Sequence, residues 1–400
     1  QVANTTLTIS MITREALRVL ENNLVFAKRV NRSYDSKFAV EGAKIGTVLN
    51  VRKPPRYIGR TGQALSVEDA TETQVQVSLN TQFGVDVEFT SQDLALSIDD
   101  FSERFIRPAI SCVANKIDND GLALYKDVYQ EISDGATPDT LLEYLQGGAK
   151  LDEAATPMDG LRSIVIPPLF QATIVDALKG LFQQATALAS QYESGKMGRA
   201  IGFDWFMDQN CNTHTYGTQA GTPLVNGASQ SGASLITDGW TSGAATLNRG
   251  DTFTIADVNS INPQSRANTG SLQSFVVTST ISDTAGAMTI AISPSMTATG
   301  AQQTISAAAA DNAALTIADT TGAVSPQGLM FHRDAFTLVT ADLPLPGGVD
   351  MAARMSDSQL GISIRMVRAY DINTDKFPCR LDVLYGWKTL RPELAVRMQG

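Results

Sequence analysis

Few side chains in this sequence have the types and spacing that chemistry requires. His214 and His332 are its only histidines, too few for a histidine-based metal site unless carboxylates supply most of the ligands. They flank a low-charge segment and could approach each other there, more readily as a hinge contact than as a ligand pair. The run DNDG at residues 118–121 is similar to a calcium loop, but Lys116 stands where the first ligand belongs. Helical periodicity across this run favours a solvated helix face.

Motifs for nucleophiles and phosphate binding are also missing from the sequence. It contains no GxGxxG, GxxxxGK[ST] or GxSxG, and the fragment GKM at 195–197 lacks the upstream glycine and the hydroxyl of a phosphate loop. Cys112, Cys211 and Cys379 fit neither a disulfide framework nor a metal knuckle, which favours a reducing cytoplasm. Cys112 lies among apolar helical positions, so we expect a buried thiol there. These patterns predict a protein that is not an enzyme and that uses no cofactor or metal.

The charge balance limits the partners that the protein can bind. A net charge of -10 argues against tight, sequence-independent binding to duplex nucleic acid, because that binding depends on Lys and Arg. Residues 1–60 nevertheless carry eleven basic and four acidic side chains. This basic segment could lie on an acidic surface of its own chain or of a neighbour, or it could be merely solvated. The candidate subunit-interface residues are Arg14, Arg18, Arg52, Lys53, Arg56 and Arg60.

Hydrophobic periodicity predicts the elements that carry these basic residues. Apolar steps of three and four predict an amphipathic helix over residues 10–28. Alternation over 45–52 and unbroken alternation over 75–89 predict a long two-stranded ribbon. Such a ribbon is only marginally stable alone and needs a surface to lie on. A further apolar stripe predicts a long helix from 97 to about 132, and Pro108 should kink it or split it into a short and a long helix.

A change of composition marks an insertion. Residues 221–330 contain eight charged residues, no Lys and no Glu, and they are rich in Ser and Thr. Short strands are predicted at 251–258, 273–281 and 287–293, separated by Gly, Asn and Ser turns. The composition returns to its earlier character beyond both edges. We therefore predict an all-β domain at residues 218–328, inserted into a mixed domain.

Short motifs within this layout are similar to those of a known family. They are ANKID at 114–118, FDWFMD at 203–208, YGW at 385–387 and RPE at 391–393. In these motifs and in the order of its elements, the chain resembles the major coat proteins of tailed phages, in particular the P22 type with an insertion domain. The resemblance implies an α+β, HK97-like capsid fold with an inserted all-β domain. The implied divisions are the N-terminal arm 1–43, the E-loop hairpin 44–90, the spine helix of the P domain 91–139, the first part of the A domain 140–217, the inserted β domain 218–328, the A-domain return 329–359 and the C-terminal strands of the P domain 360–400.

The resemblance also implies a function and a set of partners. It implies a major capsid protein that self-assembles into pentamers and hexamers of an icosahedral shell. That shell would enclose packaged double-stranded DNA without sequence-specific binding. A separate scaffolding protein during assembly and a portal protein are further implied partners. The implied location is the virion capsid, assembled in the cytoplasm of the host cell.

Two alternatives from other classes remain open on the sequence alone. A secreted or surface-layer β-rich adhesin would account for the Ser- and Thr-rich insertion. Residues 1–30 lack the sectors of a signal peptide, and the long helix pattern also counts against an adhesin. A cytosolic enzyme with an accessory β domain would need a catalytic site that the sequence does not contain.

Overall fold

The computed structural model describes residues 24–34, 48–65, 67–69, 72–90, 107–133, 137–177, 198–356 and 362–400. The chain divides into two compact units. Unit 1 comprises the described residues of Gln1–Val51, Val75–Gly121 and Phe336–Lys388, and unit 2 those of Arg52–Gln74, Leu122–Ala335 and Thr389–Gly400. Most of the predicted helix at 10–28 lies outside the described residues. In the part of the chain that is described, no helix has the length and apolar character needed to span a membrane.

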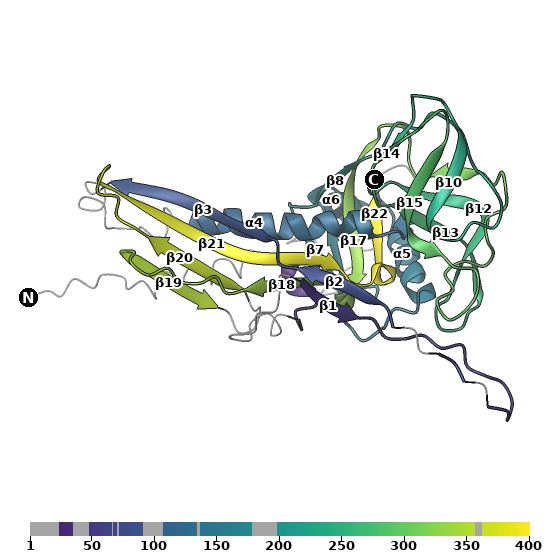
Figure 1. The fold of residues 1–400 in the computed structure, drawn as a ribbon, viewed down its shortest axis with the longest axis horizontal. Helices are drawn as coiled ribbons and strands as arrows, with labels where there is room; N and C mark the ends of the chain where they lie inside the picture. Colours follow the sequence, from purple (N-terminus) through teal and green to yellow (C-terminus); the bar gives the residue numbers. More distant parts are fainter. Residues whose placement is uncertain are drawn as a thin grey trace, which may run out of the picture. The chain divides into compact units, whose positions relative to one another are not determined.

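Unit 1 is a β-sheet with a helix alongside it (Figure 1). Its strands are β18 (Phe336–Ala341), β21 (Lys376–Thr389), β20 (Ser363–Arg368) and β19 (Met351–Ser356) in that order, and β3 (Thr81–Thr90) pairs antiparallel with β21. Helix α4 (Arg107–Leu122) is tied to β21 by Trp387, whose Nε1 donates to the Ile117 carbonyl at 3.1 Å. Alternate residues of β20 and β21, including Ile364 and Leu381, are buried. The period of two therefore gives this sheet one apolar face.

The predicted strand at 75–89 is two strands with different partners. β2 (Gln74–Ser78) pairs with β1 (Val48–Arg52), whereas β3 joins β21 in the sheet of unit 1. A Cβ on Gly386 of β21 would lie 2.0 Å from the Ser78 carbonyl oxygen, so only glycine permits this close approach. The prediction of one long two-stranded ribbon was wrong, because alternation identifies an extended chain but not its pairing partner.

The main sheet of unit 2 collects strands from distant parts of the chain. Its order is β4-β22-β17-β5-β7-β6, and β8 also pairs with β17. Its elements are β4 (Glu131–Ile132), β5 (Arg162–Ile166), β6 (Arg199–Ala200), β7 (Phe203–Met207), β8 (Thr213–Thr215), β17 (Val324–His332) and β22 (Ala395–Gln399), with helices α5 (Leu141–Glu153) and α6 (Pro168–Ala177). Tyr144 of α5, Phe170 of α6 and Met330 of β17 meet in one buried core. We call this the central sheet.

The long predicted helix ends earlier than expected. α4 ends at Leu122, a 3-10 turn follows over Ala123–Asp127, and β4 pairs in parallel with β22. Val128 and Ile132 are buried, as the apolar stripe requires. A spacing of four residues also repeats on one face of an extended chain, which is why the stripe did not distinguish helix from strand here. Residues 91–106 lie outside the described residues.

The chain crosses from one unit to the other at points that differ from the divisions predicted from the sequence. β17 begins inside the predicted insertion 218–328, so that segment ends earlier than predicted, and β17 belongs to the central sheet of unit 2. The later strands of the predicted segment 329–359, β18 and β19, belong to unit 1. Within the predicted segment 360–400, β20 and most of β21 belong to unit 1 but β22 belongs to unit 2. Alternating strands have the same pattern in every sheet, so periodicity cannot assign a strand to its sheet.

The low-charge segment forms a β-structure with its own core. Its main sheet has the order β16-β12-β13-β15-β10-β9, and β11 pairs with β14 beside it. The bounds are β9 (Gly221–Val225), β10 (Gly232–Trp240), β11 (Thr246–Leu247), β12 (Thr252–Ile261), β13 (Asn268–Val277), β14 (Ile281–Ser282), β15 (Met288–Met296) and β16 (Leu315–Ile317). β12, β13 and β15 overlap the strands predicted at 251–258, 273–281 and 287–293. Leu235, Phe275 and Ile290 are fully buried in one cluster drawn from this segment.

Candidate assembly site

The segment Arg52–Gln74 leaves the β1–β2 pair as an extended hairpin, visible in purple in Figure 1. The last backbone contact of the pair is the Lys53 N–H, which donates to the Thr73 carbonyl at 2.7 Å. Pro54 and Pro55 follow, and proline has no N–H with which to continue a ladder. The chain therefore leaves strand pairing here. We call residues 52–74 the hairpin.

A carboxylate holds the outer part of the hairpin in shape. The Glu68 side chain accepts hydrogen bonds from the backbone N–H groups of Ile58, at 2.7 Å, and Gly59, at 2.6 Å. Gly59 has a φ of 78°, in the left-handed region that glycine adopts without strain. The Arg60 guanidinium donates to the carbonyl of Gly62. The described residues of the hairpin are thus locally ordered without a hydrophobic core among them.

The hairpin exposes large apolar side chains. Tyr57 is 56% exposed, Ile58 59%, Leu65 84% and Val67 81%. Exposed apolar groups that gather on one feature are typical of an interaction site. Sequence reasoning missed these residues because they show no period. Their one sequence signal is that apolar residues recur in a Gly- and Pro-containing loop.

The basic residues predicted for a subunit interface fall into two groups, and Arg52 and Arg60 form the outward-facing one. Arg52 lies 3.4 Å from Glu72 across the hairpin, but its side chain is 78% exposed. Arg60 is also exposed. Arg14 and Arg18 lie outside the described residues. The outward-facing pair is therefore accessible to another molecule.

Lys53 and Arg56 face the protein's own unit instead. Arg56 Nη2 lies 3.4 Å from Glu393 Oε1, with both side chains less than one-third exposed. Burial lowers the pKa of Lys53; Glu393 acts in the opposite direction, and Arg391 and Arg56 lower this pKa further. The structure therefore brings Lys53 and Arg56 together at Glu393. Of the alternatives left open by the sequence, these two residues follow the one in which the basic segment contacts acidic groups of its own chain.

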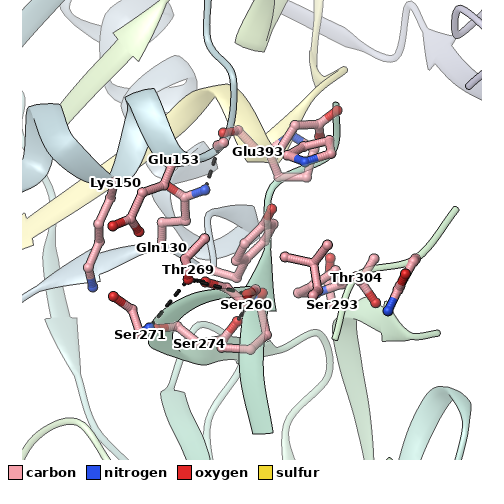
Figure 2. Close-up of a pocket in the computed structure, with 18 of the residues that line it drawn as sticks. Gln130, Lys150, Glu153, Ser260, Thr269, Ser271, Ser274, Ser293, Thr304 and Glu393 are labelled. Atoms are coloured by element: carbon pink, nitrogen blue, oxygen red, sulfur yellow. Dashed lines mark hydrogen bonds between the residues drawn. The ribbon is translucent and has the colours of Figure 1, made fainter. Parts of the chain in front are cut away.

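A polar pocket of about 270 Å³ adjoins the base of the hairpin. Figure 2 shows its lining, where Gln130 Nε2 donates to the Glu393 carbonyl at 3.3 Å and Thr269 donates to the Ser260 carbonyl at 3.2 Å. Hydroxyl, amide and charged side chains dominate, among them Lys53, Arg56, Lys150, Glu153, Ser271, Ser274 and Thr304. None of the described residues lining this pocket is His or Cys. Its side chains can bind polar groups, but they do not pair a nucleophile with an imidazole base.

The calcium-like run at 118–121 is a structural device in unit 1. Asp118 is fully buried and accepts hydrogen bonds from the backbone N–H groups of Val25, at 2.6 Å, and Ala27, at 3.0 Å. Asp120 accepts a hydrogen bond from the Tyr385 hydroxyl at 2.6 Å. The expectation of a solvated helix face was therefore wrong for Asp118, because its carboxylate binds the segment that follows residue 24. Cys112 was expected to be buried, but its position on α4 leaves it exposed.

The two histidines do not come together. His214 Nε2 lies 2.8 Å from Asp251 Oδ1, and His332 Nε2 lies 3.1 Å from Asp159 Oδ1. His214 is opposite Ser325 on β17, whereas His332 stands seven residues further along that strand, roughly 23 Å away at about 3.3 Å per residue. The expectation that they might approach each other was wrong, because β17 separates them along its length. His214 alone contacts the insertion.

A buried polar network anchors the insertion to the central sheet. The Arg397 side chain is fully buried, and its Nη2 lies 2.7 Å from Glu131 Oε2. The same guanidinium donates to Thr252 Oγ1 at 3.0 Å and to the Gly250 carbonyl, both at the start of β12. Sequence reasoning missed this pair because 266 positions separate its members. The contact is structural, since the charges face each other rather than a cavity.

Comparison with known proteins gives one family match. Residues 2–400 match a family model described as "P22 coat protein - gene protein 5". No curated protein sequence matches the chain.

Solved structures with a similar course of the chain come from several sources. A structure of Mycobacterium phage Che8 is 13% identical, with 94% of this chain and 90% of that chain covered and a TM-score of 0.48. The capsid of the cyanophage P-SCSP1u is 10% identical, with 94% and 87% covered and a TM-score of 0.47. A virus-like particle from Pyrococcus furiosus is 8% identical, with 97% and 98% covered and a TM-score of 0.43.

Proposed function

Because the chain belongs to the P22 coat protein family, we propose that it is the major capsid protein of a tailed phage and that its hairpin joins one subunit to the next. Family membership makes the chain a bacteriophage coat protein that forms an oligomeric shell in the virion, and it confirms the predicted HK97-like capsid fold. The finer proposal is a shell of pentamers and hexamers with icosahedral symmetry, in which the hairpin is the E-loop.

One observation carries the role of the hairpin: it exposes Tyr57, Ile58, Leu65 and Val67 on a segment without a core of its own. Fully burying a side chain such as Leu or Val is favourable by about 1.5–3 kcal/mol. A neighbouring copy of the chain is a surface that supplies this burial in every subunit at once. The hairpin would then take part in every such contact between subunits of the shell rather than remain a free loop.

Charge supports the same contact. Arg52 and Arg60 are exposed, while the chain as a whole carries a net charge of -10. A neighbouring copy therefore presents an acidic average surface to these arginines. Exposed ion pairs are each worth only about 0.2–1 kcal/mol, so their role is to set the register of an apolar contact.

The remaining partners follow from the proposed shell. Packaged double-stranded DNA would be enclosed without sequence-specific binding, consistent with the acidic balance of the chain. A separate scaffolding protein and a portal protein would take part in assembly, which we place in the cytoplasm of the host cell. The insertion would stabilise the subunit and decorate the outside of the shell. The protein would act without catalysis.

Assembly of hairpin variants tests this proposal. Leu65→Ser with Val67→Ser should leave the unassembled subunit folded, because both side chains are largely exposed there. The yield of shells should fall about tenfold or more, since each lost burial is worth about 1.5–3 kcal/mol and about 1.4 kcal/mol corresponds to a factor of ten. Sedimentation and negative-stain microscopy measure the yield. Ile236→Ser on the insertion sheet, where the side chain is 47% exposed, is the matched control and should assemble normally.

The same assay separates the charge contribution from the apolar one. Arg52→Glu with Arg60→Glu spares the contacts of Lys53 and Arg56 with Glu393, so the subunit should remain folded. Its assembly should fail at low salt and recover at about 1 M salt, where the Debye length is about 3 Å. Shell yields equal to wild type for both hairpin variants at low salt would overturn the proposal.

A further inference from the structure

The insertion has two basic residues, and each contacts a residue outside the insertion. Between residues 218 and 328 the sequence contains Arg249 and Arg266 and no lysine. Arg249 Nη2 lies 2.7 Å from Asp127 Oδ1. Arg266 Nη2 donates to the main-chain carbonyl of Tyr57 in the hairpin at 3.1 Å. The second contact links the insertion directly to the assembly site.

The turn that carries Arg266 is firmly built. It joins β12 to β13, and the Asn262 side chain accepts hydrogen bonds from the N–H groups of Gln264 and Ser265, both at 2.9 Å. The Arg266 N–H donates to the Asn262 carbonyl at 2.9 Å. Asn262 Nδ2 also donates to the Glu153 carbonyl at the end of α5, at 2.9 Å. The turn is therefore fixed to α5 as well as to its own strands.

The Arg266 guanidinium is also bound by carbonyl groups of the insertion itself. Besides Tyr57, it donates to the carbonyl of Ala301 at 3.0 Å and to that of Gly300. A guanidinium is a planar, rigid fork of donors, so fixing some of its N–H groups orients the others. Nη1 donates to Gly300, and Nη2 donates both to Ala301 and to Tyr57, so the 300–301 segment fixes the plane from which Nη2 reaches the hairpin. Tyr57 is held through its backbone, which leaves its side chain exposed.

We propose that Arg266 is a positioning residue through which the insertion sets the direction of the hairpin before subunits meet. This inference rests on the proposed function of the hairpin. Tyr57 and Ile58 stand directly at the clamped carbonyl, and Leu65 and Val67 lie on the opposite arm of the same hairpin. Ordering a loop before it binds removes part of the conformational entropy cost from the binding step. The insertion would therefore act on assembly although it supplies none of the hairpin's contacts to the neighbour.

The clamp can be tested on unassembled full-length protein. Arg266→Ala should raise amide hydrogen exchange at residues 56–60 about five-fold, within the range expected for one lost hydrogen bond. Arg266→Lys keeps the charge without the planar fork and should give an intermediate rate. Arg249→Ala, which removes the other arginine of the insertion, should leave exchange at 56–60 unchanged. Exchange in β12 and β13 serves as an internal check that the insertion stays folded.

Assembly rates then distinguish the clamp from the function of the hairpin. We expect Arg266→Ala to assemble more slowly than Arg249→Ala at equal concentration. Exchange at 56–60 that is the same in Arg266→Ala and wild type would overturn the clamp whatever the assembly rate. Faster exchange with an unchanged assembly rate would overturn the effect of the insertion on assembly. It would leave in place the contact of Arg266 with Tyr57 and the proposed role of the hairpin, which the variant Leu65→Ser with Val67→Ser tests separately.

Discussion

The insertion and the hairpin are two segments that extend from the central part of unit 2, and we call them its excursions. They differ in whether their apolar side chains are buried. The insertion buries Leu235 and Phe275 completely, whereas the hairpin leaves Leu65 84% and Val67 81% exposed. The insertion has therefore gained the free energy of apolar burial within one subunit. The hairpin can gain it only against another surface. An excursion with its own core can fold by itself, while one without a core is suited to contact.

The two excursions also differ in how they are anchored. Arg397 and Glu131 meet at 2.7 Å in a fully buried network beneath the insertion. The hairpin is held at its base by Arg56 and Glu393, which retain 30% and 19% exposure. Breaking a buried pair is costly, whereas partly exposed pairs contribute little. The insertion is therefore a fixed part of unit 2, and the hairpin is an adjustable one.

The largest expected effect concerns the anchor of the insertion. Arg397→Met leaves the Glu131 carboxylate buried without its cation, and breaking such a pair costs about 3–5 kcal/mol in the free energy of unfolding. Arg56→Met removes the pair with Glu393 at the base of the hairpin and should cost about 0–1 kcal/mol. Chemical denaturation of the unassembled protein measures both. Similar losses in the two variants would show that the anchors do not differ.

Matched leucine substitutions test the difference in packing. Leu235→Ala removes a fully buried side chain from the insertion and should cost about 2–5 kcal/mol. Leu65→Ala in the hairpin should change the stability of the unassembled protein by no more than about 0.5 kcal/mol. Residues 218–328 expressed alone should fold cooperatively and should show the same loss for Leu235→Ala. A disordered NMR spectrum of this fragment would refute an independent insertion.

The smallest expected effect concerns a feature that the insertion and the hairpin share, a carboxylate that accepts hydrogen bonds from backbone N–H groups. Asp283 in the insertion accepts backbone N–H groups of Gly243, at 2.8 Å, and Ala245, at 3.1 Å, much as Glu68 does in the hairpin. These hydrogen bonds lower the pKa of Asp283 from its usual 3.8. Its stabilisation is therefore present above pH 3.8 and is lost as the pH falls through the lower folded-state pKa. Asp283→Asn should slightly lower the Tm at pH 7.

The pH dependence of the difference in Tm between wild type and Asp283→Asn tests whether the carboxylate charge stabilises the loop. Thermal melts of wild type and Asp283→Asn should converge as the pH falls well below 3.8, because both side chains are then neutral. A gap in Tm that stays constant from pH 7 into the acid range would mean that the carboxylate charge does not stabilise the loop.

The insertion was the part of the fold most open to prediction. Its strands pair mainly with near neighbours, as β12 does with β13, so composition and turns bounded it. The central sheet brings together strands near residues 131, 164, 330 and 396, and no local pattern encodes such distant pairing. The strand pattern at 75–89 likewise predicted an extended chain but could not predict that β3 leaves β2 for β21.

The sequence predicted which charged residues belong to the candidate site, but not which side chains of the site are buried and which are exposed. Arg52, Lys53, Arg56 and Arg60 were identified by charge asymmetry, but their division into outward-facing and inward-facing pairs depends on Glu393, more than 330 positions away. The exposure of Leu65 and Val67 depends on the absence of a packing partner within the described hairpin, which no residue pattern states. Asp118 is the opposite case: the sequence predicted a solvated side chain, but its carboxylate is buried and accepts hydrogen bonds from backbone N–H groups.

The position of β22 inside the central sheet has a consequence for the order of events on the ribosome. β22 lies between β4 and β17, and both β17 and β22 follow the core of the insertion in the sequence. The core of the insertion, from Val225 to Leu315, is already translated when β17 and β22 of the central sheet do not yet exist. Domains that are complete fold as they emerge during synthesis. The nascent chain would therefore carry a folded insertion while the sheet that supports it still lacks two of its interior strands, β17 and β22.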